Sequence, residues 1–169
     1  MDPQQPLIES GKKAFDIEKE RISVISDIKL SFNDSKKGRA EAYVTMLCTN
    51  GEARVSVNQK EYVLQKNDLL ICCPGDEVQG LGNSDDLSAC GFYLSRKFFE
   101  ELSSMPLGLI NARVYIAEHP QLHISDHAAL VYTQYYELIR SKLTAEVPIK
   151  HHQLVSDLLL QAFMYEFHD

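Results

Sequence analysis

Short runs of apolar residues, some alternating with polar ones, fill the chain from residue 22 to residue 95 and are divided by polar turn signals. In "EARVSV" (52–57) every second side chain is apolar, and further strand-like runs, most of them largely apolar, lie at 43–49, 61–64, 69–73 and 87–95. A period of two is typical of β-strands, and short strands at about ten-residue spacing indicate a sandwich or barrel. Asn50-Gly51 is a strong hairpin signal, so the strands at 43–49 and 52–57 are expected to pair through it.

The pattern changes in the second half of the chain. "ARVYIA" (112–117) is expected to form one more short strand. Ser125 or Asp126 can cap a helix that runs to about Leu143, and Pro148 can open a last helix that continues to the end of the chain. Strands followed by two long helices predict an α+β fold.

Composition and charge narrow the class of protein. The chain has 169 residues, enough for one domain with a proper core, and its net charge of −7 argues against a basic face for nucleic acid. The first 13 residues are polar and carry no signal-peptide pattern, and no apolar run approaches the roughly 18 residues that cross a bilayer. We therefore expect a cytoplasmic protein whose four cysteines are reduced.

The stretch "CGFYLSRKFFEELSS" (90–104) contains a tract similar to the start of the second recognition helix in AraC-type DNA-binding domains. The residues before it are strand-like, however, whereas a helix-turn-helix requires a helix there. Ser95 can instead cap a short helix over 95–104 that covers the β module. Arg96 and Lys97 are accordingly not expected to read DNA.

The run "VTMLCTNGEARVSVNQKEYVLQKNDLLICCPGDEVQG" (44–80) resembles the cupin pattern of strands and turns. The order of elements over about 20–168 resembles the N-terminal effector-binding and dimerisation domain of AraC/XylS-family transcription regulators. This resemblance implies a flexible N-terminal arm (1–20), a small cupin-like jelly-roll β-barrel (21–117) and a helical pair for packing and dimerisation (118–169). The chain ends inside a helical pattern, so the family's DNA-binding domain is expected beyond it.

The resemblance implies a function as well. The chain would be the ligand-sensing and dimerisation domain of a bacterial AraC-type regulator, not an enzyme, and would control a helix-turn-helix DNA-binding domain absent from this chain. Its partners would be a small-molecule effector and a second copy of itself, with DNA reached through the missing domain and no membrane. The alternatives are a metal-free cupin enzyme, for which Glu77 and Tyr43 are the candidate titratable pair, and a stand-alone cupin binding protein acting on a small metabolite.

Metal-dependent cupins hold their metal with histidine and carboxylate ligands inside the barrel. The corresponding positions carry Ser-Val-Asn (56–58) and Asp-Glu-Val (76–78), and the first histidine is His119. His119, His123 and His127 are spaced by four, but a proline interrupts the first step. We therefore expect neither a metal nor a cofactor.

Alternation along the strands also predicts the barrel interior. The candidate ligand-binding residues are Tyr43, Thr45, Leu47, Val55, Val57, Ile71 and Cys73. A slip of one residue would replace the set from the first strand by Val44, Met46 and Cys48. A mostly apolar cavity with one phenol, one hydroxyl and one thiol suits a small, partly apolar effector such as a sugar derivative or an aromatic acid. The alternative is that these side chains simply fill the barrel.

The last helix is too apolar for one buried face. Ten of the fourteen residues in 154–167 are apolar, about twice what a helix with a single buried stripe needs. A two-fold helical interface would cover the second face, and a thick intramolecular core is the alternative. The candidate interface residues are Tyr135, Leu138, Leu158, Leu159 and Phe163.

Overall fold

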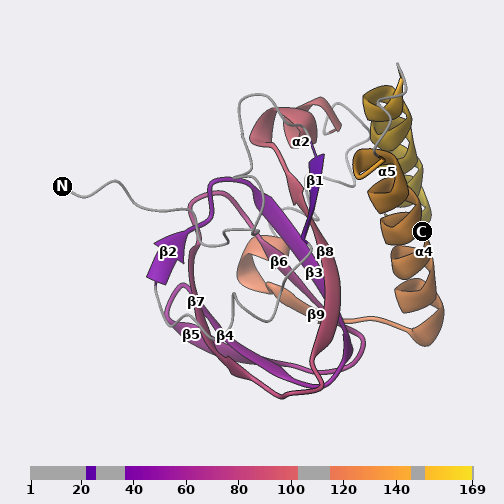
Figure 1. The fold of residues 1–169 in the computed structure, drawn as a ribbon. Helices are drawn as coiled ribbons and strands as arrows, with labels where there is room; N and C mark the ends of the chain where they lie inside the picture. The colour runs from indigo at the N-terminus through magenta and orange to yellow at the C-terminus, as the bar shows by residue number, and fades with distance from the viewer. Residues whose placement is uncertain (1–21, 26–36, 103–114, 146–150, 169) are drawn as a thin grey trace.

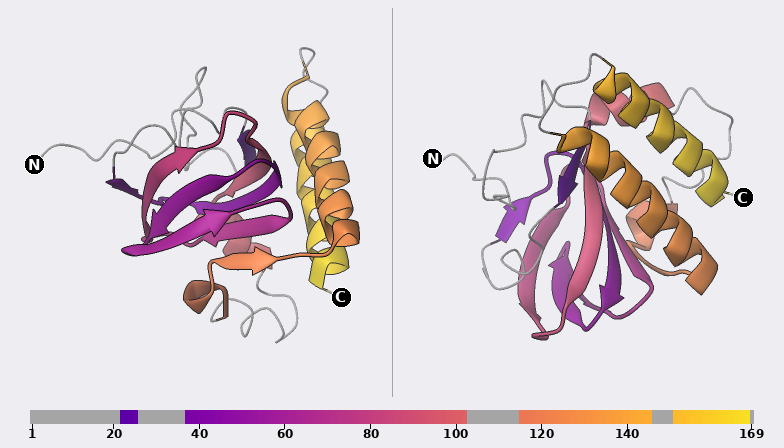
Figure 2. Two further views of the ribbon diagram at one scale, coloured as in Figure 1. Left: turned by 90° about the horizontal axis from the view of Figure 1, so that it is seen from below. Right: turned by 45° about the vertical axis from the view of Figure 1, so that its right-hand side comes forward.

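Two antiparallel sheets packed face to face form the β module. The computed structural model describes residues 22–25, 37–102, 115–145 and 151–168. The strands are β1 (Ile22–Ile25), β2 (Lys37–Arg39), β3 (Tyr43–Asn50), β4 (Ala53–Val57), β5 (Lys60–Leu64), β6 (Asp68–Cys72), β7 (Glu77–Asn83), β8 (Ser88–Leu94) and β9 (Gln121–His123). The helices α4 (Asp126–Leu143) and α5 (His152–His168) lie side by side along one of the two sheets (Figures 1 and 2).

The strand order is that of a jelly roll. One sheet has the order β1-β8-β3-β6-β9 and is called the helix-side sheet here; the other has the order β2-β7-β4-β5 and is called the far sheet. Most consecutive strands switch from one sheet to the other, which is how the two Greek keys of a jelly roll wind. The predicted α+β fold, a jelly-roll module followed by a pair of long helices, is confirmed.

The turn at Asn50-Gly51 is not a hairpin, and the sequence prediction of one was wrong. β3 and β4 belong to different sheets, so this turn is a corner between them. Gly51 has a φ of 72°, and a Cβ at this position would lie 2.7 Å from the backbone nitrogen of Leu87. The hairpin in this region joins β4 and β5 through Asn58 and Gln59, whose φ angles of 50° and 69° fit the two positive values of a type I′ turn.

The strand expected at 112–117 is also corrected over its described part. Residues 115–118 form a helical turn, in which the His119 amide donates to the Tyr115 carbonyl at 2.8 Å. Residues 112–114 lie outside the described part. The strand that joins the helix-side sheet is β9, which pairs with β6.

The short helix α2 (Arg96–Leu102) follows β8 directly. The Ser95 hydroxyl caps it by accepting a hydrogen bond from the Phe98 amide at 3.1 Å, and the Phe98 ring is fully buried. Arg96 and Lys97 are exposed. A strand therefore stands where a helix-turn-helix would need its first helix, as the sequence indicated.

Two long helices complete the described part. α4 (Asp126–Leu143) begins and ends as predicted, and its cap is the Ser125 hydroxyl, which accepts from the Ala128 amide at 3.1 Å. α5 (His152–His168) packs against α4. Pro148, expected at the start of the last helix, lies outside the described residues, as does the arm at 1–20.

Buried side chains form two cores, one on each face of the helix-side sheet. The inner core lies between the two sheets, and its buried members are Ile25, Ala40, Met46, Cys48, Ala53, Val55, Val57, Leu64, Leu70, Cys72 and Leu87. The outer core lies between the helix-side sheet and the helices, and it includes Tyr43, Leu47, Phe92, Phe98, Tyr132, Tyr136, Ile139, Leu160 and Phe163. The helix-side sheet is thus covered on both faces.

Candidate functional site

The inner core is the candidate ligand site, and the structure changes which residues line it. Val44, Met46 and Cys48 of β3 belong to the inner core, as do Leu70 and Cys72 of β6. The side chains of β3 are therefore in the phase that the sequence analysis held as its alternative.

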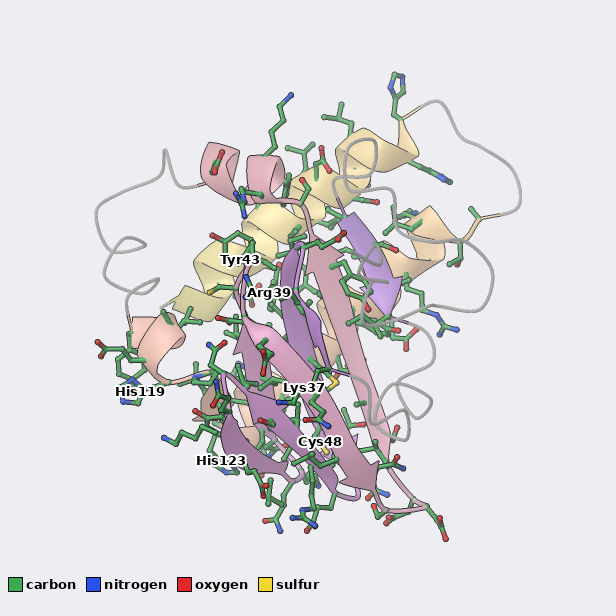
Figure 3. The ribbon with its side chains drawn as sticks, turned by 90° about the vertical axis from the view of Figure 1, so that its left-hand side faces the viewer. Lys37, Arg39, Tyr43, Cys48, His119 and His123 are labelled. Carbon is green, nitrogen blue, oxygen red and sulfur yellow. The ribbon has the colours of Figure 1, made fainter. Side chains whose placement is uncertain are left out.

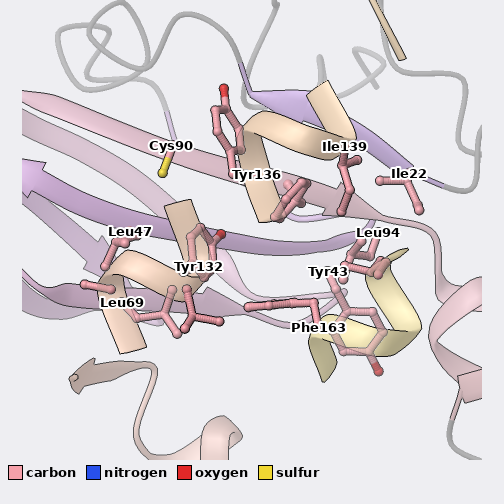
Figure 4. Close-up of a cluster of buried hydrophobic side chains, with 14 of the residues drawn as sticks. Ile22, Tyr43, Leu47, Leu69, Cys90, Leu94, Tyr132, Tyr136, Ile139 and Phe163 are labelled. Atoms are coloured by element: carbon pink, nitrogen blue, oxygen red, sulfur yellow. The ribbon is translucent and has the colours of Figure 1, made fainter. Parts of the chain in front are cut away.

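The seven predicted ligand-binding residues do not share one interior. Val55 and Val57 line the inner core as expected. Tyr43 and Leu47 belong to the outer core, where Figure 4 shows them beside Tyr132 and Phe163, and Ile71 and Cys73 pack against it. Thr45 also faces the helices, because its hydroxyl lies 2.9 Å from the Tyr132 hydroxyl. The prediction that these seven line one cavity was wrong for five of them; a ligand-binding role for Val55 and Val57 stays a prediction.

The two ends of the inner core differ in their burial. At the corner between β3 and β4, the Glu52 amide donates to the Ser84 hydroxyl at 2.8 Å, and Leu87 and Cys48 are buried. At the opposite end, Val44, Val78 and Tyr93 are only partly buried.

The polar groups of the inner core are neutral. Burial raises the pKa of the Tyr93 phenol well above its usual range, and it raises the pKa of the Cys48 thiol to about 11. Burial also raises the pKa of the Cys72 thiol strongly. These groups can donate or accept hydrogen bonds, but at neutral pH they offer a ligand no charge.

The candidate titratable pair of the enzyme alternative is separated in the structure. Tyr43 is buried in the outer core. The Glu77 carboxylate lies 3.5 Å from the Lys37 ammonium group, and both side chains are more than one-third exposed. The two side chains therefore do not face each other across the inner core.

On its outer face, the helix-side sheet is bonded to α4 through two phenols. The Tyr132 hydroxyl lies 2.9 Å from the Thr45 hydroxyl on β3, and the Tyr136 hydroxyl donates to the Ile25 carbonyl on β1 at 3.1 Å. Both rings pack on Phe92, with centroids 5.8 and 5.5 Å away. Desolvation raises the pKa of both tyrosines, so both hydroxyls stay protonated at neutral pH.

A polar cluster on β6 fixes the start of α4, and no local pattern in the sequence indicated it. The buried Asp68 carboxylate accepts from the Gln65 amide at 2.8 Å, from Gln121 Nε2 at 2.9 Å and from His123 Nδ1 at 2.8 Å. Asn67 Nδ2 donates to the Asp126 carboxylate at 2.6 Å. These bonds hold β9 and the first turn of α4 against the end of β6.

The three evenly spaced histidines do not converge. His119 stacks on Tyr115 with ring centroids 4.4 Å apart, His123 bonds to Asp68, and His127 lies in the first turn of α4. Figure 3 shows His119 and His123 on the outside of the molecule. Within the part of the chain that the structure describes, no three histidine, cysteine or acidic side chains come together as a metal site.

The predicted interface residues lie at two different depths. Phe163 is 5% exposed, and Leu159 packs against the outer core. Tyr135 is partly buried, and its hydroxyl donates to the Glu166 carboxylate at 2.7 Å. Leu138 and Leu158 are 44% and 55% exposed, and Leu154, which is not one of the predicted interface residues, is 57% exposed. We call Leu138, Leu154 and Leu158 the outer leucines.

Three of the four thiols are expected to resist alkylation. A pKa raised from 9.0 to about 11 lowers the thiolate fraction of Cys48 at pH 8 about a hundredfold, and the pKa of Cys90 is raised to about 12 by burial. Cys73 is partly exposed. Iodoacetamide followed by intact mass measurement should give a single fast adduct on the folded chain and four in urea, and Cys73→Ser should remove the fast one. Two or more fast adducts on the folded protein would contradict this assignment.

Comparisons with known proteins give likenesses to solved structures at low sequence identity. No family model and no curated protein sequence matches the chain. The AraC-like transcriptional activator CuxR is 10% identical, with a TM-score of 0.46 over 85% of this chain and 48% of CuxR. The apo form of a lysine-to-alanine variant of ToxT from Vibrio cholerae is 11% identical, with a TM-score of 0.48 over 86% of this chain and 54% of ToxT. The cupin domain of Schizosaccharomyces pombe Cnp3 is 11% identical, with a TM-score of 0.33 over 43% of this chain and 54% of that domain.

The chain spans about half the length of these solved chains. In the described residues, no helix has the length and apolar character required to cross a membrane.

Proposed function

We propose that this chain is the effector-sensing and dimerisation domain of an AraC-type transcription regulator. It would bind a small molecule without transforming it, and it would control a helix-turn-helix domain that is not part of this chain. The observation that carries the proposal is that the helix-side sheet is covered on both faces by different parts of the chain. One face lines an apolar interior, and the other is hydrogen-bonded to a helix. The resemblance of the sequence to the family's N-terminal domains supports the same function.

The inner core selects a class of effector. Its walls are aliphatic side chains with the Tyr93 phenol and the Cys48 and Cys72 thiols among them. An apolar or aromatic body would pack between the sheets, and a polar group such as a carboxylate would lie at the end formed by Val44, Val78 and Tyr93. Small aromatic acids and sugar derivatives remain the classes that fit this description.

A thermal-shift screen of small aromatic acids and sugar derivatives tests the binding step. A ligand present at about 100 times its Kd stabilises a protein by about 2.7 kcal/mol, which raises the Tm of a domain of this size by roughly 5–10 °C. Val44→Trp should abolish the shift, because the indole would occupy the partly buried end of the inner core. Val63→Trp is the matched control, since Val63 is 43% exposed on β5 and the same substitution there should preserve binding.

Recovery of the ligand separates a sensor from the enzyme alternative. A sensor returns the bound compound unchanged after prolonged incubation, and mass spectrometry would detect any product. The proposal fails if the compound is consumed catalytically, or if every stabilising compound is equally effective on the Val44→Trp variant.

A further inference from the structure

The last residue of β1 takes part in both faces of the helix-side sheet. The Ile25 side chain is 1% exposed and belongs to the inner core. Its carbonyl accepts the hydrogen bond from the Tyr136 hydroxyl of α4 at 3.1 Å. A single residue thus contacts the candidate ligand site through its side chain and the helical pair through its backbone.

A glycine sets the position of the Ile25 side chain. Gly91 of β8 is paired with Ile25 on one side and with Met46 of β3 on the other. A Cβ added at Gly91 would lie 3.2 Å from Ile25 Cδ1, so this methyl rests over the bare glycine. An occupant of the inner core that contacts this part of the sheet must share the space with Ile25 Cδ1.

The two hydrogen bonds that join α4 to the helix-side sheet end on strands in different positions of that sheet. Thr45, which meets Tyr132, lies on β3, a central strand with β8 and β6 as its two neighbours. Ile25, which meets Tyr136, lies on β1, a four-residue strand at the edge of the helix-side sheet, where β8 is its one neighbour among the described strands. A short edge strand opens at lower cost than a central one, so the Ile25 anchor can move while the Thr45 anchor stays.

We propose that β1 transmits occupancy of the inner core to α4. An occupant that displaces the Ile25 side chain from Gly91 moves the Ile25 carbonyl, releases the Tyr136 hydroxyl and lets α4 shift about the Tyr132–Thr45 contact. The inference rests on the proposed function, in which an effector enters the inner core. It adds the route by which binding of that effector in the inner core changes the position of α4.

Amide hydrogen exchange of α4 tests the route without any ligand. Ile25→Val removes the methyl that rests on Gly91, and Tyr136→Phe removes the hydroxyl while keeping the ring. Val57→Ala is the matched control, because Val57 is also buried in the inner core but lies on β4 of the far sheet. Global stability is measured in parallel by urea unfolding, so that local opening of α4 can be separated from whole-chain unfolding.

We expect Ile25→Val to speed exchange at residues 132–139 about fivefold beyond its effect on global stability, the range set by loss of one hydrogen bond. Val57→Ala should produce no such local excess. In the Tyr136→Phe background, Ile25→Val should change the exchange rates of α4 less than twofold further, because the hydrogen bond between Tyr136 and the Ile25 carbonyl is already absent.

The inference is overturned if Ile25→Val and Val57→Ala affect α4 equally after correction for global stability. It is also overturned if the excess caused by Ile25→Val persists in the Tyr136→Phe background. Since no ligand is used, these outcomes are independent of the thermal-shift screen. If Ile25→Val has its local effect on α4 but no compound raises the Tm, the result counts against the proposed sensing function. If a compound binds but Ile25→Val has no local effect on α4, the result counts against β1 as the link to the helices.

Discussion

Replacing Gly91 by alanine is expected to destabilise the chain by about 2–4 kcal/mol, enough to remove much of the stability of an ordinary domain. A Cβ at this position would overlap the Thr45 carbonyl oxygen and lie 3.1 Å from Met46 Cα. Both atoms belong to the backbone of β3, so the clash cannot be relieved by turning a side chain. The strands β3 and β8 would have to separate at the centre of the helix-side sheet. Urea unfolding followed by circular dichroism measures the loss.

Gly82→Ala is the control for the Gly91 substitution. Gly82 has a φ of 134°, which alanine adopts with strain, but a Cβ there meets nothing within 4 Å. The control should therefore cost about 1–3 kcal/mol from backbone strain alone, whereas the Gly91 variant adds a steric displacement of a neighbouring strand. If Gly91→Ala were neutral to within about 0.5 kcal/mol, β3 and β8 could not approach as closely as the structure shows.

The elements that rest on local chemistry could be predicted from the sequence. The first turn of α4 follows from Ser125, whose hydroxyl accepts from the Ala128 amide. α2 follows from Ser95 in the same way. On β4, Ala53, Val55 and Val57 alternate with Arg54 and Ser56, and the structure places the three apolar residues in the inner core. This strand could be oriented because the outer face of the far sheet carries polar residues.

The phase of β3 and β6 could not be predicted in the same way. In β3, Tyr43 and Leu47 are buried in the outer core, while Met46 and Cys48 are buried in the inner core. A strand covered on both faces has no polar side to mark its orientation, and a slip of one residue exchanges the two faces. The second covering layer comes from α4 and α5, which begin more than 70 residues after β3 and more than 50 residues after β6. Local alternation therefore carries no information about which face is which.

The error at Asn50-Gly51 has a different cause. A turn signal reports that the chain reverses, but not whether the next strand joins the same sheet. In a jelly roll most consecutive strands change sheet, so β3 pairs with β6 and β8 rather than with β4. The sequence could have predicted the corner only if the jelly-roll winding had been applied strand by strand.

Charged substitutions on α5 are expected to separate folding from self-association. Phe163 packs edge-on against Tyr132, with ring centroids 5.3 Å apart, and is 5% exposed. Phe163→Asp should unfold the chain, because truncating a buried phenylalanine alone costs about 3–5 kcal/mol and the buried carboxylate adds to that. Leu158→Asp should leave the fold intact, since Leu158 is 55% exposed.

Leu158→Asp is expected to weaken self-association of the chain. Leu154 and Leu158 are one helical turn apart on α5, so their exposed side chains lie on the same face. If a second copy of the chain covers this face, a charge at Leu158 must be desolvated in the dimer, and the dimer should weaken at least about a hundredfold. Sedimentation velocity over a range of concentrations measures the change, and thermal unfolding checks that the variant remains folded.

Leu130→Asp is the matched control for the outer leucines. Leu130 is also a leucine that is 55% exposed, but it lies in the second turn of α4 and not on α5. This variant should keep the thermal stability and the self-association of the unmodified chain if the interface lies on Leu154 and Leu158 of α5. Equal weakening by Leu130→Asp and Leu158→Asp would show a general effect of surface charge instead. If the unmodified chain is monomeric at high micromolar concentration, the dimer is ruled out, and the exposed leucines of α5 must have another role.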